Sequence, residues 1–249
     1  MDRRAQALFD LDGRVALVTG AAKGIGRGIA ENLALVGAGV VVADIDADEA
    51  ARCAEAIAGA GGRALAVDCD VGDEAAVQAL IGRAVDVFGR LDVVVTNAAI
   101  YPMSPIAEMP TALWDRVLGV NLRGTFLVSR AALPHLVAAG DRGRLINISS
   151  IDTWKSYVGM GHYDASKGGI EAFTRSCALE LAPHGATAAR WTPAPSTRSS
   201  PRAFRSATGR ARTTSGALPC SSPLPRRLTS PARPSTSTAA SSSLCRMRT

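Results

Sequence analysis

Two polar residues that could exchange protons, Tyr163 and Lys167, lie four positions apart in a segment with helical periodicity. Residues at this spacing lie on one helix face, so the phenol and the ammonium group are neighbours. A tyrosine titrates near pH 10 in water, and lowering its pKa to about 7, where it could act as a general acid or base, requires roughly 4 kcal/mol. A positive charge about 4 Å away, at an effective dielectric near 20, contributes on the order of 4 kcal/mol. One lysine is therefore enough to supply the energy that lowers the pKa of the tyrosine.

A serine precedes this pair by thirteen positions. Ser150 follows an apolar run that includes Leu145, Ile146 and Ile148 and predicts a strand. We therefore expect Ser150 at the carboxyl end of that strand, opposite the start of the tyrosine helix, where open α/β sheets bind ligands. A Tyr-x-x-x-Lys pair also occurs on solvated helix faces, so the pair by itself leaves a catalytic and a surface interpretation open.

A glycine-rich turn lies near the start of the chain, between a predicted strand at 15–19 and residues that are apolar at helical spacing. Glycine allows the backbone to turn tightly and to approach a pyrophosphate, whose charge the helix N-terminus stabilises. A strand, a glycine turn and a helix in this order predict a dinucleotide site. The residues expected to hold the cofactor here are Gly20, Lys23, Gly24, Ile25 and Gly26.

The next apolar run ends in an acid, Asp44. A carboxylate at the end of this second strand can accept both hydroxyls of the adenosine ribose and repels a 2′-phosphate, which favours NAD over NADP. Ile45 agrees, because sites for NADP often have a basic residue beside that position. Lys23 points the other way, since a cation in the glycine turn could contact the additional phosphate. The alternative for Asp44 is a helix-capping acid ahead of Asp46.

Strand and helix patterns alternate up to residue 186. We expect further strands over 64–68, 91–97 and 145–149, and helices over 48–59, 73–88 and about 111–139. Strands that alternate with helices of these lengths predict a parallel sheet covered on both faces. The predicted fold class is therefore α/β, a single doubly wound, Rossmann-type domain over 1–186 that binds a dinucleotide and carries the catalytic residues.

These motifs together resemble the short-chain dehydrogenase/reductase family over about residues 10–186. The resemblance rests on six features in order, which are Thr19-Gly-x-x-x-Gly-x-Gly26, Asp70-Val71, Asn97-Ala98, Asn121 within Val-Asn-Leu-Arg-Gly, Ser150, and Tyr163-x-x-x-Lys167. One departure is Ala99, whose methyl group stands where the family has a glycine that gives the cofactor room.

The resemblance implies a role for each catalytic residue. Tyr163 would exchange the proton with the substrate oxygen, while Lys167 lowers the pKa of the phenol and hydrogen-bonds the nicotinamide ribose. Ser150 would hold the substrate oxygen, and Asn121 a water that relays protons to Lys167. Taken singly, Asn121 could instead be a helix-kink residue and Ser150 a plain strand-end hydroxyl.

The resemblance also implies cofactor contacts beyond the glycine turn. Asp70 and Val71 would contact the adenine, and Asn97 and Ala98 would hold the cofactor near its ribose. Asp70 could instead be a helix cap. The activity implied is the reversible oxidation of a secondary alcohol to a ketone with NAD and without a metal.

The substrate is expected between the loop that contains Tyr101 and the segment from Trp154 to Tyr157. These residues are aromatic or apolar, so we expect an apolar or aryl substrate, similar to those of the aryl secondary-alcohol dehydrogenases of this family. Trp154 and Met103 could equally be packing residues. The expected partners are this small-molecule substrate and, by the resemblance, other copies of the chain in a homo-tetramer or homo-dimer.

The last part of the chain has a different composition. Residues 187–249 contain eleven arginines and no Asp, Glu or Lys, so they carry +11 and leave −5 of the net charge of +6 to residues 1–186. They also lack Val, Ile, Asn, Gln and Tyr, and such a segment buries too little apolar surface to offset its chain entropy. We therefore expect 187–249 to be a disordered or out-of-frame tail in place of the family's C-terminal strands and helices.

A shifted reading frame near residue 185 would explain this composition. Arginine outnumbers lysine 25 to 3, as expected of a GC-rich gene, and misread GC-rich codons yield mostly Arg, Pro, Ser, Ala, Thr and Gly. Such a chain would leave the fifth strand with an unpaired apolar edge, so we expect poor solubility and little activity. One alternative is a non-catalytic or inactive dinucleotide-binding protein. Nucleic-acid binding by the arginines is a further alternative, but it is disfavoured because the rest of the chain is acidic.

Targeting and metal motifs are weak in this sequence. The first residues, Met-Asp-Arg-Arg-Ala-Gln, are not followed by an apolar h-region, and no run approaches eighteen apolar residues, so we expect a cytoplasmic protein without a membrane span. The five cysteines are scattered and lack C-x-x-C spacing, which argues against a disulfide framework or a zinc site.

Overall fold

The structure, a computed structural model, describes residues 9–192 and contains one six-stranded parallel sheet. The strand order is β3-β2-β1-β4-β5-β6. The strands are β1 (Val15–Thr19), β2 (Gly39–Asp44), β3 (Arg63–Asp68), β4 (Val93–Thr96), β5 (Arg144–Ile148) and β6 (Thr187–Trp191). The chain builds the sheet outward from β1 to β3 and then returns to place β4 on the other side of β1. This reversal creates the switch point at which doubly wound sheets bind ligands, and it confirms the predicted fold class.

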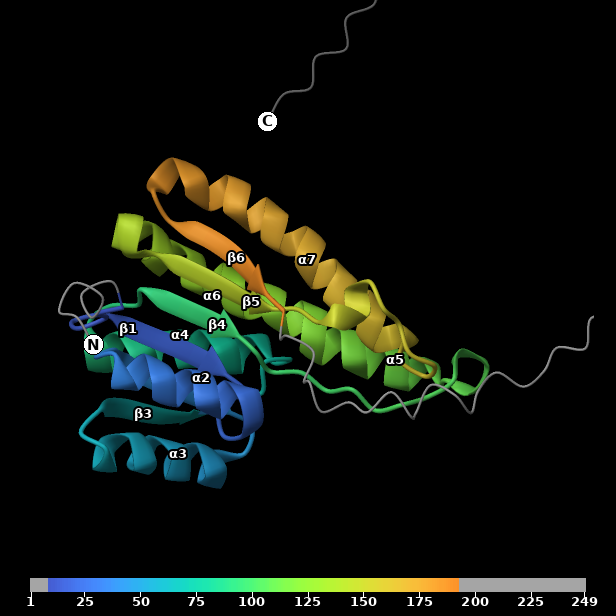
Figure 1. Cartoon of the computed structure of the whole chain (residues 1–249), viewed down its shortest axis with the longest axis horizontal. Coiled ribbons are helices and arrows are strands. Elements are labelled where there is room, and N and C mark those ends of the chain that lie inside the picture. Colours follow the sequence, from blue (N-terminus) through green and yellow to red (C-terminus); the bar gives the residue numbers. More distant parts are fainter. Residues whose placement is uncertain (1–8, 193–249) are drawn as a thin grey trace, which may run out of the picture. The chain divides into compact units, whose positions relative to one another are not determined.

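Helices cover both faces of the sheet (Figure 1). The helices are α2 (Gly24–Leu35), α3 (Ala47–Gly59), α4 (Glu74–Phe88), α5 (Thr111–Leu118), α6 (Gly124–Ala139) and α7 (Gly161–Leu181). Successive strand residues pack into two separate apolar clusters: Leu17 belongs to the cluster with α4, α6 and α7, whereas Val18 belongs to the cluster with α2 and α3. Burial on both faces explains why the fully buried strands β1, β2 and β4 are apolar except at their last residue.

Local signals in the sequence place the helix ends. Asp46 caps α3 by accepting from Glu49 N at 3.2 Å, and Asp73 caps α4 by accepting from Ala75 N at 2.8 Å. Gly89 ends α4 with a φ of 76°, a conformation that favours glycine. The helices predicted over 48–59 and 73–88 are thus confirmed.

The helix predicted over 111–139 is interrupted. A π-helical turn, η2 (Gly119–Arg123), separates α5 from α6. Such turns insert one residue into a helix and are frequent at functional sites. Here the turn contains Asn121, whose side chain is fully buried.

The edge of the sheet at β5 corrects one expectation. The sequence predicted that the fifth strand would lack a neighbour, but β6 pairs with β5 in parallel, and Ser149 N donates to Trp191 O at 2.8 Å. Strand pairing uses backbone groups that all residues except proline possess, so the composition of 187–191 did not prevent it. Ordered structure therefore continues for five residues beyond the boundary predicted at 186. The rest of the predicted tail, 193–249, lies outside the described residues.

Within residues 9–192, no helix is both long enough and apolar enough to cross a bilayer.

Candidate active site

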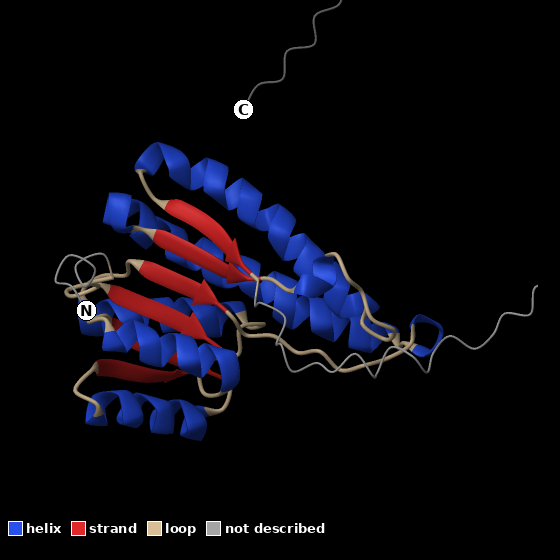
Figure 2. Cartoon of the chain, viewed as in Figure 1, coloured by secondary structure: helices blue, strands red, loops and turns tan. Residues whose placement is uncertain are grey.

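The predicted site residues gather at the carboxyl edge of the sheet, toward which all the strand arrows point (Figure 2). Gly20 follows β1, Asp44 ends β2, Asn97 follows β4 and Ser150 follows β5. Parallel strands bring these positions together even though they are far apart in the chain. Helix α7 then places Tyr163 in its first turn.

The glycine turn is closely packed against the loop after β4. A Cβ atom at Gly26 would lie 2.1 Å from the carbonyl oxygen of Gly20, and one at Gly20 would lie 2.8 Å from the Cα of Ala98. Gly20 and Gly24 have φ values of 62° and 58°, which favour glycine. A Cβ at Gly24 would meet no atom within 4 Å, so the N-terminus of α2 faces open space. A tight turn with space over a helix N-terminus fits a bound pyrophosphate.

Asn97 holds this turn rather than reaching away from it. Its Nδ2 donates to the carbonyl oxygens of Thr19 and Gly20 at 3.0 and 2.9 Å. The hydroxyl of Thr19 in turn accepts from the backbone N–H groups of Asn97 and Ala98 at 3.0 and 3.2 Å. The sequence predicted that Asn97 and Ala98 hold the cofactor near its ribose, and this role stays a prediction. Their observed hydrogen bonds hold the glycine turn in place.

Asp44 is 8% exposed and links β2 to the glycine turn. Its carboxylate accepts from Ala22 N at 3.0 Å and from Asp46 N at 3.1 Å. The helix-capping alternative for Asp44 is wrong, because Asp46 is the residue that caps α3. Lys23 lies 4.0 Å from the Asp46 carboxylate and is largely exposed.

Two further predicted cofactor residues follow β3. Asp70 is exposed and accepts from Gly72 N at 2.8 Å. Val71 is buried, and a Cβ at Gly124 would lie 2.9 Å from its Cγ2, so it packs closely against the start of α6. Both residues lie at the carboxyl edge of the sheet, and their predicted contact with adenine stays a prediction.

Lys167 is buried beneath the tyrosine. Its Nζ donates to the carbonyl oxygen of Ile148 at 2.8 Å and lies 5.6 Å from the centre of the Tyr163 ring. Burial lowers the pKa of Lys167 to about 8, since the charged form loses hydration.

Tyr163 shows a difference from the predicted electrostatics. Burial raises the pKa of Tyr163, its hydrogen bond with Ser150 lowers that pKa, and Asp152, Tyr101 and Asp164 raise it further. The sequence predicted a lowered pKa because of Lys167. In this structure the Lys167 ammonium donates to Ile148 O and lies 5.6 Å from the centre of the Tyr163 ring, and desolvation of the phenolate is the largest influence on the pKa of Tyr163.

Asn121 joins two parts of the site. Its Oδ1 accepts from Ile100 N at 2.9 Å, and its Nδ2 donates to Ile100 O at 2.9 Å and to Ser166 Oγ at 3.1 Å. The side chain therefore fastens the loop after β4 to helix α7. The backbone carbonyl of Asn121 accepts a hydrogen bond from the Thr125 hydroxyl at 2.7 Å. The predicted role of Asn121 in holding a water that relays protons to Lys167 stays a prediction.

An apolar rim lies beside Tyr163. Its exposed members come from two segments. Tyr101, Met103 and Ile106 follow β4, and Trp154, Tyr157 and Val158 precede α7. The ring of Tyr101 meets that of Tyr163 edge to face, with centres 6.1 Å apart. Ser104 N donates to Gly159 O at 2.9 Å and ties the two segments together. Of the predicted substrate residues, Tyr101 contacts the Tyr163 ring, and Trp154 and Tyr157 are exposed in the segment before α7; their role in substrate binding stays a prediction.

Sequence reasoning missed three carboxylates near the candidate catalytic residues Ser150 and Tyr163. Asp152 and Asp164 raise the pKa of Tyr163, and Glu171 binds the hydroxyls on either side of Ser150. Glu171 carried one available signal, since it lies four residues beyond Lys167 on the same helix.

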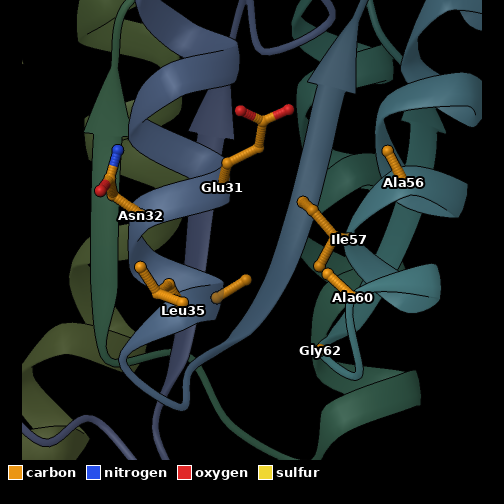
Figure 3. Close-up of a pocket in the computed structure, with 8 residues that line it drawn as sticks. Glu31, Asn32, Leu35, Ala56, Ile57, Ala60 and Gly62 are labelled. Carbon is orange, nitrogen blue, oxygen red and sulfur yellow. The ribbon is translucent and has the colours of Figure 1, made fainter.

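A cavity of about 400 Å³ lies between α2 and α3 (Figure 3). Its lining includes Leu35, Ile57, Ala60 and Gly62. These residues lie at the ends of the two helices that lead into β2 and β3, which is the edge of the sheet opposite the glycine turn. The cavity is therefore separate from the candidate site.

Comparison with known proteins agrees with this geometry. The family model described as short chain dehydrogenase matches residues 14–201. Cis-4-hydroxycyclohexanecarboxylate dehydrogenase of Sinomonas cyclohexanicum is 45% identical over 173 residues, or 69% of each chain. (2S)-[(R)-hydroxy(phenyl)methyl]succinyl-CoA dehydrogenase subunit BbsD of Thauera aromatica is 37% identical over 177 residues, or 71% of each chain. A metagenomic short-chain oxidoreductase in complex with NADP has a TM-score of 0.70 at 36% identity, covering 74% of this chain and 83% of that one.

Proposed function

Because the chain belongs to the short-chain dehydrogenase family of oxidoreductases, we propose that it transfers a hydride between NAD and an apolar or aryl secondary alcohol or its ketone. One observation carries this proposal: Tyr163 and Ser150 lie together at the carboxyl edge of the sheet, where the Ser150 hydroxyl acts to lower the pKa of Tyr163, and the buried Lys167 lies beneath the tyrosine ring. The glycine turn formed by Gly20, Gly24 and Gly26 lies at the same edge of the sheet.

The proposed oxidation divides the work between the chain and the cofactor. Oxidised NAD, when bound, supplies the hydride acceptor. Ser150 holds the alcohol oxygen, and Tyr163 accepts its proton as the C–H bond gives up hydride, so that a ketone, NADH and a proton result. The positive charges of Lys167 and of the oxidised nicotinamide favour the phenolate and oppose the effect of burial on the pKa of Tyr163.

The preference for NAD rests on Asp44. Its carboxylate lies at the end of β2, where the ribose of a bound dinucleotide is expected, and a negative charge there repels a 2′-phosphate. The structure of the metagenomic short-chain oxidoreductase in complex with NADP is the observation that favours NADP instead. Titration of NAD and NADP by quenching of protein fluorescence measures this preference directly.

The substrate class rests on the apolar rim. Tyr101, whose ring contacts Tyr163, is 67% exposed, and Trp154 in the segment before α7 is 76% exposed. The names of the two relatives describe a cyclic and a phenyl-substituted alcohol, which supports the proposal. A screen that follows NAD reduction with aryl, cyclic and linear secondary alcohols, and with primary alcohols as controls, tests it. Equal turnover of all alcohols would contradict an apolar site, and no turnover with bound NAD would favour the alternative of an inactive dinucleotide-binding protein.

The tail predicted over 187–249 is the specific reason to keep that alternative. We propose comparing this chain with one in which the reading frame is corrected after residue 186. The frame-corrected chain is expected to be the more active and the more soluble. Equal turnover and solubility of the two chains would contradict a shifted frame as the cause of the unusual composition.

A further inference from the structure

Helix α7 presents a third functional residue on the face that carries Tyr163 and Lys167. Glu171 follows Lys167 by four positions, as Lys167 follows Tyr163, so the three side chains occupy successive turns of one face. The first two residues belong to the proposed chemistry. Glu171 is too far along the helix to act on the same atoms, so its contacts must show what it does.

Three donors converge on the Oε1 atom of Glu171. Ser149 Oγ donates at 3.1 Å, Thr153 Oγ1 at 3.0 Å and the guanidinium of Arg190 at 2.6 Å. The hydroxyl of Thr153 also lies 2.9 Å from the carbonyl oxygen of Ser150, so its single proton is shared between the two acceptors. The carboxylate therefore binds the residues on both sides of Ser150.

The environment makes these contacts effective. The side chain of Glu171 is 17% exposed, so water competes weakly for the carboxylate, and hydrogen bonds to an ionised acceptor are stronger than those between neutral groups. The side chain of Arg190 is 41% exposed, so solvent screens its charge in part. The two hydroxyls are thus the contacts through which Glu171 holds the segment after β5.

The same segment is fixed at its start by Lys167, whose Nζ donates to Ile148 O. Residues 148–153 are consequently fastened to α7 at Ile148, at Ser149 and at Thr153. Ser150 lies between these points. Its hydroxyl accepts from Asp152 N at 3.2 Å and also acts to lower the pKa of Tyr163. One helix therefore fixes both the tyrosine and the serine that must share a substrate oxygen.

We propose that Glu171 is a positioning residue, which holds Ser150 in register with Tyr163 by anchoring Ser149 and Thr153 to helix α7. The inference rests on the proposed function for its catalytic consequence. The anchoring itself concerns the geometry of Ser150 and Tyr163 and can be measured without turnover.

The test compares Glu171→Ala with Glu171→Gln in the full chain. Alanine removes the acceptor, whereas glutamine keeps an oxygen at the end of the same side chain. Glu180→Ala is the matched control, because Glu180 is an exposed acid on the same helix. We expect Glu171→Ala to lower kcat for the alcohol about tenfold through misplacement of Ser150, to leave the Kd for NAD unchanged, and to be largely rescued in Glu171→Gln.

A second measurement follows the ionisation of Tyr163 by the ultraviolet absorbance of tyrosinate, with the titration of a Tyr163→Phe variant subtracted. Loss of the Ser150 hydrogen bond should raise the pKa of Tyr163 in Glu171→Ala, and the control should leave it unchanged. The other groups that act on Tyr163 are the same in every variant, and they are Lys167 and Asp164 on α7, Asp152 before it and Tyr101 after β4.

The proposal is supported if the pKa of Tyr163 is raised in Glu171→Ala but not in the Glu180→Ala control. It is overturned if Tyr163 in Glu171→Ala titrates at the wild-type pKa. If Glu171→Ala does not fold, the double variant Ser149→Ala with Thr153→Val releases the same segment and gives the same two readings. If the wild-type chain binds NAD but turns over no alcohol, the proposed function fails, while the tyrosine titration still decides the role of Glu171.

Discussion

Replacement of Lys167 by methionine should change the way in which stability depends on pH. Burial lowers the pKa of Lys167 from 10.5 to about 8 in the folded protein. Between these two values the folded chain binds fewer protons than the unfolded chain, so the free energy of unfolding of the wild type rises with pH through this window. Below about pH 8 the wild type keeps a buried charge at its full cost, and methionine removes that cost.

The magnitude follows from the same values. A shift of about 2.5 pKa units corresponds to about 3 kcal/mol. Methionine also leaves the buried carbonyl of Ile148 without its donor, which costs about 1–3 kcal/mol at every pH. Because that cost does not titrate, it cancels when two pH values are compared. The difference in unfolding free energy between variant and wild type should therefore change by about 3 kcal/mol in favour of the wild type between about pH 7 and about pH 10.5.

Urea denaturation followed by circular dichroism at several pH values measures this difference. Lys155→Met is the control, because Lys155 is exposed, and its stability should follow that of the wild type at every pH. Lys167→Met should also lose alcohol oxidation, since the ammonium beneath Tyr163 is gone. Parallel pH profiles for Lys167→Met and the wild type would refute the assignment of a desolvated lysine.

Three further substitutions test the other parts of the site. Tyr163→Phe should lower kcat/KM about 10²- to 10⁴-fold in the alcohol assay with an unchanged Kd for NAD, and a variant that keeps its turnover would refute the proton-transfer role. Gly26→Ala should abolish NAD binding in fluorescence titrations, because its Cβ would lie 2.1 Å from Gly20 O. The control Gly28→Ala should bind NAD normally, because a Cβ there meets no atom within 4 Å. Asp44→Asn should shift the ratio of NAD to NADP affinity about tenfold toward NADP, or about 1.4 kcal/mol, and an unchanged ratio would refute the repulsion of the 2′-phosphate.

The parts of the fold that the sequence predicted depend on local signals. Strand β2 is apolar up to its terminal Asp44 because both of its faces are buried, and Asp73, which directly precedes α4, caps the start of that helix. The glycines that the cradle needs are also local, because backbone conformation and close packing at Gly20 and Gly26 admit few other residues. These features need no knowledge of distant contacts.

The parts that the sequence did not predict depend on contacts between distant residues. The π-helical turn brings Asn121 to Ile100. The sequence offered Asn121 as a possible helix-kink residue, but nothing in residues 111–139 indicates its contact with Ile100. The pKa of Tyr163 depends on how deeply the folded chain buries the phenol, which the spacing to Lys167 does not encode. Glu171 has the spacing of a helix face, but its function becomes visible only when Ser149 and Thr153 are placed beside it.

Strand β6 links the unusual end of the chain to the catalytic residues. Its Trp191 carbonyl accepts from Ser149 N, and its Arg190 pairs with Glu171, so residues beyond 186 support both the backbone and the carboxylate next to Ser150. A boundary placed at residue 186 by composition would therefore cut through the support of the site. The paired backbone accounts for this, because it orders 187–191 although Thr187 and Arg190 are polar and Ala188 and Ala189 are small. The charged and exposed side chains of β6 nevertheless bury little apolar surface, so this support depends on hydrogen bonds and on one partly screened ion pair.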